Sequence, residues 1–119
     1  MLNNLKRQWS EIVSMLKLAE RFYALDDAHA IRVQIRMDEE LVASTQIYQR
    51  IEERRGDRVE IDWDYIDLDA VPARLLGRVV EIKMIVERFN AGELADLPPS
   101  TTPDFLAERE ERRMRRRMR

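Results

Sequence analysis

Residues 69–92 read DAVPARLLGRVVEIKMIVERFNAG, the most apolar run in the chain. Asp69 and Pro72 suit the first turn of a helix, and Gly92 suits the left-handed position that ends one. Helical spacing aligns one apolar row at Leu75, Val79, Ile82, Val86 and Phe89, and widens it at Leu76, Val80 and Met84. A helix that is apolar on more than one side needs more than one partner, in this chain or in a second copy.

The N-terminal segment predicts a second helix, from about residue 3 to residue 25. Its apolar side chains recur at alternating steps of three and four residues, at Leu2, Leu5, Trp9, Ile12, Leu16, Ala19 and Tyr23. Such a heptad seam is typical of a helix that lies along another helix at a shallow angle. We expect this seam to cover one side of the helix at 69–92.

Residues 27–55 allow two interpretations. Ile31, Val33 and Ile35 alternate with polar residues, which is the pattern of a strand. The same span also aligns an apolar helical face at Ala30, Val33, Met37, Leu41, Tyr48 and Ile51. We favour one long helix that ends at Gly56, in which case Ile31 and Ile35 lie off the core face and need a further partner. The alternative is a strand followed by a shorter helix.

Residues 57–69 alternate in the manner of a half-buried strand. Val59, Ile61, Trp63 and Tyr65 are expected on one side and charged residues on the other. A lone strand leaves its backbone hydrogen-bonding groups unpaired, so this segment is expected to contact a partner. The predicted protein interface therefore comprises Ile31, Ile35, Val59, Ile61, Trp63 and Tyr65.

The chain is expected to be mainly α-helical, as a three-helix bundle or a helical hairpin plus the central helix. A short extended segment near 58–66 and a C-terminal helical arm complete the predicted fold. Three parts are expected in order: a helical body at 1–92, a linker at 93–103 that contains Pro98, Pro99 and Pro103, and an Arg-rich arm at 104–119. With 119 residues, the protein is expected to form one domain.

Charge is distributed unevenly along the chain. Six arginines and no acid fall within residues 112–119, at Arg112, Arg113, Arg115, Arg116, Arg117 and Arg119, which leaves 15 basic and 23 acidic residues before them. These guanidinium groups suit phosphate or carboxylate partners. Residues 57–69 hold six acids and one Arg, so an acidic edge at Glu60, Asp62, Asp64 and Asp67 is one expected partner, reached in another copy of the chain.

No pattern of residues predicts catalysis or a cofactor. The chain has no cysteine and one histidine, His29, so thiolate metal sites and sites with two His ligands are excluded. Glycine-rich phosphate loops and a nucleophile elbow are absent. Asp62, Asp64, Asp67 and Asp69 lack the glycine and the final Glu of a calcium loop. We therefore expect neither enzymatic activity, nor a metal, nor a small-molecule substrate.

The sequence favours a structural, assembly or adaptor protein that acts through protein contacts. The expected partners are a second copy or a larger protein assembly, of the kind found among phage and bacterial assembly components. Non-specific binding of nucleic acid through residues 112–119 is the alternative, and it would suit a regulator or a packaging accessory. No apolar run of 18 residues or secretion signal occurs, so a cytoplasmic location, or a virion if the gene is of phage origin, is expected without a membrane.

Overall fold

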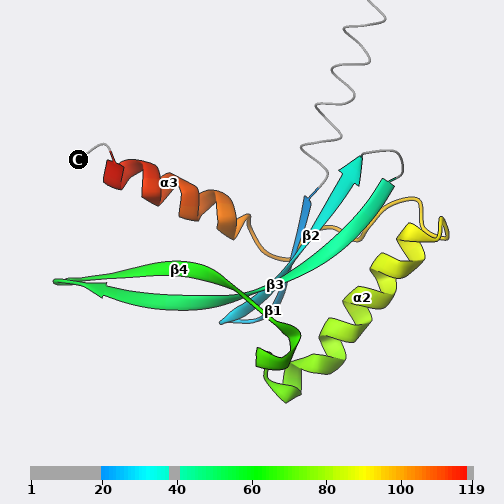
Figure 1. The fold of residues 1–119 in the computed structure, drawn as a ribbon, viewed down its shortest axis with the longest axis horizontal. Coiled ribbons are helices and arrows are strands. Elements are labelled where there is room, and N and C mark those ends of the chain that lie inside the picture. Colours follow the sequence, from blue (N-terminus) through cyan, green and yellow to red (C-terminus); the bar gives the residue numbers. More distant parts are fainter. Residues whose placement is uncertain (1–19, 38–40, 118–119) are drawn as a thin grey trace, which may run out of the picture.

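The protein folds as an antiparallel sheet of four strands followed by two α-helices (Figure 1). The structure, a computed structural model, describes residues 20–37 and 41–117. The strands are β1 (Glu20–Asp26), β2 (His29–Met37), β3 (Leu41–Arg55) and β4 (Arg58–Ile66). Two short 3-10 turns, Leu68–Ala70 and Ala73–Leu75, lead into α2 (Leu76–Asn90), and α3 (Phe105–Arg117) follows after an extended segment.

The long strand β3 joins two parts of the sheet. Its first part, from Leu41 to Gln49, pairs with β2, whereas its second part, from Ile47 to Arg55, pairs with β4. The two pairings share only residues 47–49, so the far part of the β3–β4 hairpin extends beyond β1 and β2 (Figure 1). The sheet therefore has a compact part, on which α2 packs, and a projecting arm.

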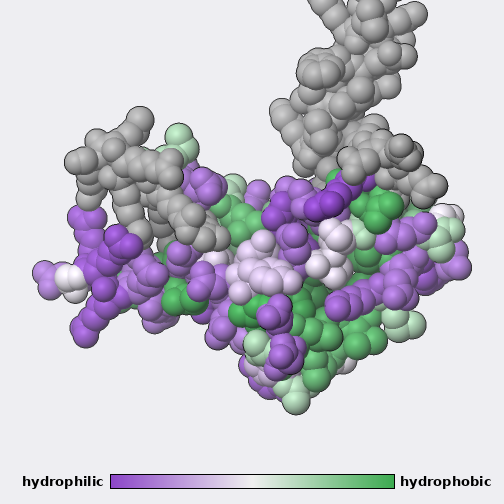
Figure 2. Space-filling model, viewed as in Figure 1, coloured by the Kyte–Doolittle hydropathy of each residue, from purple (hydrophilic) through white to green (hydrophobic). Residues whose placement is uncertain are grey.

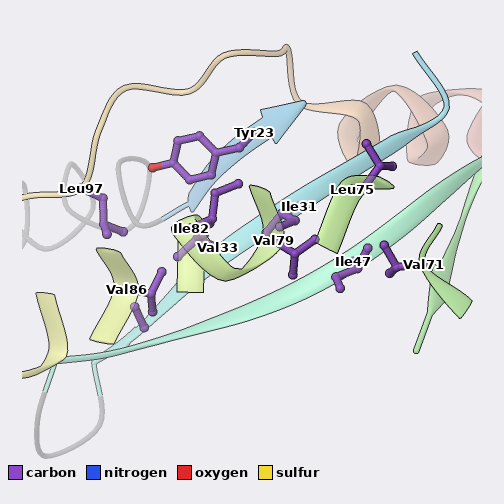
Figure 3. Packing of buried hydrophobic residues seen from close by; sticks show 11 residues of the cluster. Tyr23, Ile31, Val33, Ile47, Val71, Leu75, Val79, Ile82, Val86 and Leu97 are labelled. Carbon is purple, nitrogen blue, oxygen red and sulfur yellow. The ribbon is translucent and has the colours of Figure 1, made fainter. Parts of the chain in front are cut away.

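The helices contact opposite faces of the sheet, because successive residues of a strand point to opposite sides. Ile31 and Val33 of β2 meet Val79 of α2 in the main core, together with Ile47 of β3 (Figure 3). Ala30 points the other way and joins a smaller cluster with Phe22, Tyr48 and Phe105 of α3. Each helix thus seals one face of the same short stretch of sheet.

The expectation of a mainly α-helical bundle is wrong. The described fold is built on four antiparallel strands, and residues 27–55, expected as one helix, form β2 and β3 instead. The alternation at Ile31, Val33 and Ile35 is the decisive signal, since these β-branched residues pack against α2 from one face of β2. The alternative, a strand followed by a helix, is correct for β2 but wrong for residues 41–55.

The turns of the sheet use residues that the sequence suggests for helix ends. Gly56 does not end a helix; with Asp57 it forms the two-residue turn between β3 and β4, at a φ of 61° that glycine adopts without strain. Asp26 lies at the turn between β1 and β2. Its carboxylate accepts a hydrogen bond from the backbone N–H of Ala28 over 2.8 Å.

The expected N-terminal helix is wrong over its last residues. Residues 20–26, including Tyr23 of the predicted seam, form β1, the first strand of the sheet. The six other positions of the heptad seam, from Leu2 to Ala19, lie outside the described residues. Tyr23 is buried in the main core between the sheet and α2, rather than in a helix–helix seam.

The central helix is present but starts later than expected. Pro72 holds an extended backbone, with ψ of 136°, so the chain passes through two 3-10 turns and α2 begins at Leu76 rather than near Asp69. The end of α2 agrees with the helix end predicted at Gly92. Gly92 has a φ of 79°, and the N–H groups of Gly92 and Glu93 donate to the carbonyls of Phe89 and Arg88.

Residues 97–102 run along the free edge of β1. The Ser100 and Thr101 hydroxyls accept hydrogen bonds from the backbone N–H groups of Phe22 and Ala24, each over 3.0 Å. The Tyr23 hydroxyl donates to the carbonyl of Pro98 over 2.6 Å, and burial raises the pKa of Tyr23 to about 12. This segment, expected as a linker, therefore covers one sheet edge and carries the chain from α2 to α3.

Candidate protein interfaces

The outward side of α2 carries an apolar row that no described residue covers. Leu76, Val80 and Met84 occupy positions i, i+4 and i+8, and their exposed fractions are 37%, 53% and 57%. On the inward side, Val79 is 0% exposed and packs on the sheet with Ile82 and Val86. The two-sided apolar character expected from the sequence is thus present, with one side buried and the other open to contact.

Gly77 lies beside this row, near the start of α2. A β-carbon built there meets no atom within 4 Å, and its φ lies outside the left-handed region. Within the described chain, nothing requires the absence of a side chain, although glycine inside a helix costs about 1 kcal/mol relative to alanine. Lys83 and Glu87 border the row elsewhere and carry opposite charges.

The projecting hairpin carries the predicted interface residues of β4. By register, Val59, Ile61, Trp63 and Tyr65 point to the face on which α3 lies. Trp63 stacks on Phe105 with ring centres 4.5 Å apart, so it packs within the chain. Val59 and Tyr65, in contrast, are 61% and 59% exposed and remain accessible to a partner.

Ile31 and Ile35 do not form an outer surface. Ile31 is fully buried beneath α2, and Ile35 packs against the same core cluster. Their expected place at an interface depends on a helix over 27–55, which would turn them away from its apolar face. Since β2 is a strand, both point toward α2, and the chain itself supplies the partner.

The acidic edge lies on the opposite face of β4. Glu60, Asp62 and Asp64 alternate with the apolar residues and point to the side on which α2 lies, whereas Asp67 follows the strand. Antiparallel pairing of β4 with β4 of a second copy would set acids opposite acids, which is unfavourable. Asp62 also accepts a hydrogen bond from the backbone N–H of Trp63 over 2.8 Å. This strand therefore resists pairing with itself.

Helix α3 is held at its start and extends beside β4 (Figure 1). The Phe105 ring lies edge-on to Phe22 and Tyr48, with ring centres 5.2 and 5.4 Å away. The arginines of the predicted arm belong to this helix up to Arg117, and Arg115 lies 3.9 Å from Glu111. Side-chain positions of Arg112, Arg113, Arg116 and Arg117, and all of Arg119, lie outside the described part. Up to Arg117, the arm is therefore a helix whose start packs against the sheet.

An ionic cluster joins the β1–β2 turn to the 3-10 turn that precedes α2. The Asp26 carboxylate lies 2.9 Å from Nδ1 of His29 and also pairs with the guanidinium of Arg74. Burial alone would raise the pKa of Asp26, but the hydrogen bonds from Arg74, His29 and the Ala28 N–H hold it well below its ordinary value. The cluster holds the segment that leads into α2 against the sheet, so we infer that its role is to stabilise the fold.

This cluster predicts a loss of stability in acid. A carboxyl group whose pKa is lowered by folding stabilises the protein above its unfolded pKa, about 3.9, and that contribution disappears as the pH falls further. Asp26→Asn should therefore lower the free energy of unfolding at pH 7. The difference in free energy of unfolding between wild type and this variant should become smaller below about pH 4. Urea unfolding at a series of pH values measures this difference.

Asp27→Asn, at the exposed neighbouring residue, is the control. A difference that does not change with pH would contradict the role of the cluster.

Two hollows in the described chain are candidate ligand sites. One, of about 390 Å³, lies between the sheet and α3 and is lined by Glu20, Arg32, Tyr48, Asp104, Leu106, Ala107 and Glu110. Arg32 already bonds to Glu20 and Gln46 there. A smaller one, of about 150 Å³, lies between α2 and residues 97–101. Across residues 20–37 and 41–117, no group of three or more His, Asp or Glu side chains is arranged to hold a metal.

The described residues define a class of fold: a four-stranded antiparallel meander with one helix on each face. Neither α2 nor α3 has the length and the apolar character that crossing a membrane requires. Hydrophobic surface gathers around α2 and the strands beside it, while the projecting hairpin is hydrophilic (Figure 2). No family model, curated protein or solved structure matches the chain.

Sequence reasoning identified Leu76, Val80 and Met84 as extra apolar residues but did not place them at an interface. We expected the N-terminal seam to cover one side of the central helix. One side is in fact covered by the sheet, in which β2 and β3 take the place of the helix expected at 27–55. The signal that would have located the open row is the strand pattern itself, since a sheet covers only one side of a helix.

Proposed function

We propose that the protein is a non-enzymatic assembly or adaptor protein that acts through contacts with other protein chains. The observation that carries this proposal is the open apolar row at Leu76, Val80 and Met84 of α2. Isolated exposed apolar residues are common on soluble proteins, but a contiguous row on a rigid helix is typical of a contact surface. The core holds α2 in place from behind, so the row is presented without ordering a loop.

The second apolar area, Val59 and Tyr65 of β4, offers a weaker surface. These residues lie on a hairpin that is otherwise charged, and acids follow the opposite face of the same strand. Binding of nucleic acid through the arm is also less well supported, because the same helix carries Glu108, Glu110 and Glu111 next to its arginines. Carboxylates close to the arginines oppose the approach of a polyanion.

The proposal predicts that a charge on α2 disrupts association and that the same charge on the hairpin does not. Val80→Asp should reduce self-association at least about tenfold, since it places a carboxylate in the centre of an apolar contact. Val59→Asp adds the same charge at a valine of similar exposure and is the control. Light scattering over a concentration series gives the mass of each variant. If Val59→Asp, and not Val80→Asp, lowers the mass, the contact surface is the hairpin.

A further inference from the structure

We infer that the occupant of the α2 row is the same row of a second copy, packed antiparallel about a two-fold axis that passes close to Val80. This inference rests on the proposed function and specifies its partner. An interface related by a two-fold axis must be complementary to itself. A row at i, i+4 and i+8 meets this condition, since it has its centre at Val80 and one large apolar residue about 6 Å to either side.

Antiparallel packing gives each residue of the row a suitable neighbour. Helical spacing places Gly77 and Met84 on one flank of the row, and Leu76 and Lys83 on the other. A two-fold rotation brings each flank against the same flank of the second copy. Met84 of one copy then lies over Gly77 of the other, and Leu76 lies against the aliphatic stem of Lys83. Val80 packs on Val80 at the centre.

Gly77 supports this arrangement independently of the row. Nothing in the described chain fills the space where its side chain would lie, and glycine weakens the helix that contains it. A neighbouring helix that approaches closely at this point accounts for the residue, since the absent β-carbon leaves room for the flexible Met84 side chain. Nothing else in the described part of the chain gives a reason for glycine here.

The charges also distinguish α2 from the other candidate for self-association. Homotypic pairing of β4 sets Glu60, Asp62 and Asp64 against acids of the second copy. The row on α2 is bordered by Lys83 and Glu87, so two-fold pairing there does not set like charges against each other along the whole contact. Self-association through α2 is therefore favoured over self-association through the sheet edge.

The size of the row sets the strength of the dimer. Three side chains along about 12 Å of one helix form a small contact, well under the roughly 800 Å² per partner of a typical stable interface. We therefore infer a weak, reversible dimer that is strengthened when a larger assembly raises the local concentration of the chain.

Cysteine cross-linking tests the geometry, because the natural chain contains no cysteine. Three single variants, Leu76→Cys, Val80→Cys and Met84→Cys, are oxidised mildly under conditions in which the wild type associates. Only Val80→Cys should form a disulfide-linked dimer, because its two copies meet at the axis. The copies of residue 76, or of residue 84, lie about 12 Å apart along the helices, beyond the Cα separation that a disulfide spans. Glu81→Cys, exposed on the polar side of α2, is the control.

The other outcomes separate this inference from the proposed function. Self-cross-linking of all three variants would show parallel helices and overturn the inference. If Val80→Asp abolishes association but Val80→Cys does not cross-link, the contact through α2 is supported and the two-fold pairing is contradicted. If the thiol introduced by Val80→Cys does not react with maleimide in the monomer, another part of the chain covers the row. That result would contradict both the two-fold pairing and association through α2.

A second variant tests the role of Gly77 without a cross-link. Gly77→Ala should raise the Tm of the monomer, because alanine favours the helix, and should weaken dimerisation by about tenfold, because the added β-carbon crowds Met84 of the second copy. Sedimentation and thermal unfolding measure the two effects. Association that is unchanged or tighter in Gly77→Ala would overturn the close approach of the helices.

Discussion

Val79→Asp should destabilise the folded protein severely, whereas Val80→Asp should leave its stability nearly unchanged. Val79 is 0% exposed at the centre of the contact between α2 and the sheet, so aspartate there buries an unpaired charge and removes apolar contacts. The cost is about 4 kcal/mol or more, out of a total stability of about 5–15 kcal/mol for a typical domain. Val80 points outward, and the same change there should alter the stability of the monomer by less than about 1 kcal/mol.

This pair tests which side of α2 the sheet covers. Circular dichroism and urea unfolding measure both variants at a concentration where the wild type is monomeric. The substitutions differ by one position along the same helix, so helix propensity affects both alike and only the environment differs. Equal destabilisation of the two variants would contradict the described orientation of α2.

The second large effect concerns α3. Phe105→Ala should lower the free energy of unfolding by about 3 kcal/mol and should release α3 from the sheet. Phe105 is 3% exposed and holds the start of the helix through contacts with three aromatic rings, those of Phe22, Tyr48 and Trp63. Beyond its first residues α3 is strongly polar, so it has little other apolar anchorage.

Hydrogen exchange of the α3 amides and urea unfolding measure this effect. Released α3 should lose its protection, while the amides of β2 and β3 keep theirs, because the main core lies on the other face of the sheet. Met114→Ala, at an exposed residue of the same helix, is the control and should have little effect. Protection of α3 that survives in Phe105→Ala would show that other contacts hold the helix.

Two elements could be predicted from sequence because their signals did not compete. In β4, strict alternation of Val59, Ile61, Trp63 and Tyr65 with charged residues indicated a strand, and 58–66 is a strand. In α2, the apolar row and Gly92 indicated a helix and its end. Its start was placed too early, because Pro72 is also compatible with the extended turn that the chain adopts.

Residues 41–55 were misjudged because the strand pattern is interrupted. The side of β3 that faces α2 carries the polar Thr45 and Gln49 among its apolar residues, which weakens the alternation and leaves a helical spacing in view. The two-residue turn Gly56–Asp57 between alternating segments was a hairpin signal that we interpreted as a helix end. Recognising it would have paired 41–55 with 58–66 and so converted the predicted bundle into a sheet.

The candidate interface could be predicted only in part. Composition and periodicity showed that the central helix has more apolar surface than one partner can cover. Which side remains open depends on the neighbours of α2, and two of those neighbours, β2 and β3, had been predicted as a helix. Because β2 was predicted as part of a helix, Ile31 and Ile35 were expected at an interface. In the structure, both residues pack in the main core.

The central claim, that the open row of α2 brings chains together, is tested most directly by the mass of the wild-type protein in solution. Sedimentation equilibrium from about 1 µM to about 1 mM covers the range of a weak dimer. The mass should rise with concentration from 14.2 kDa toward twice that value. A mass that stays at 14.2 kDa up to the highest concentration would contradict the claim.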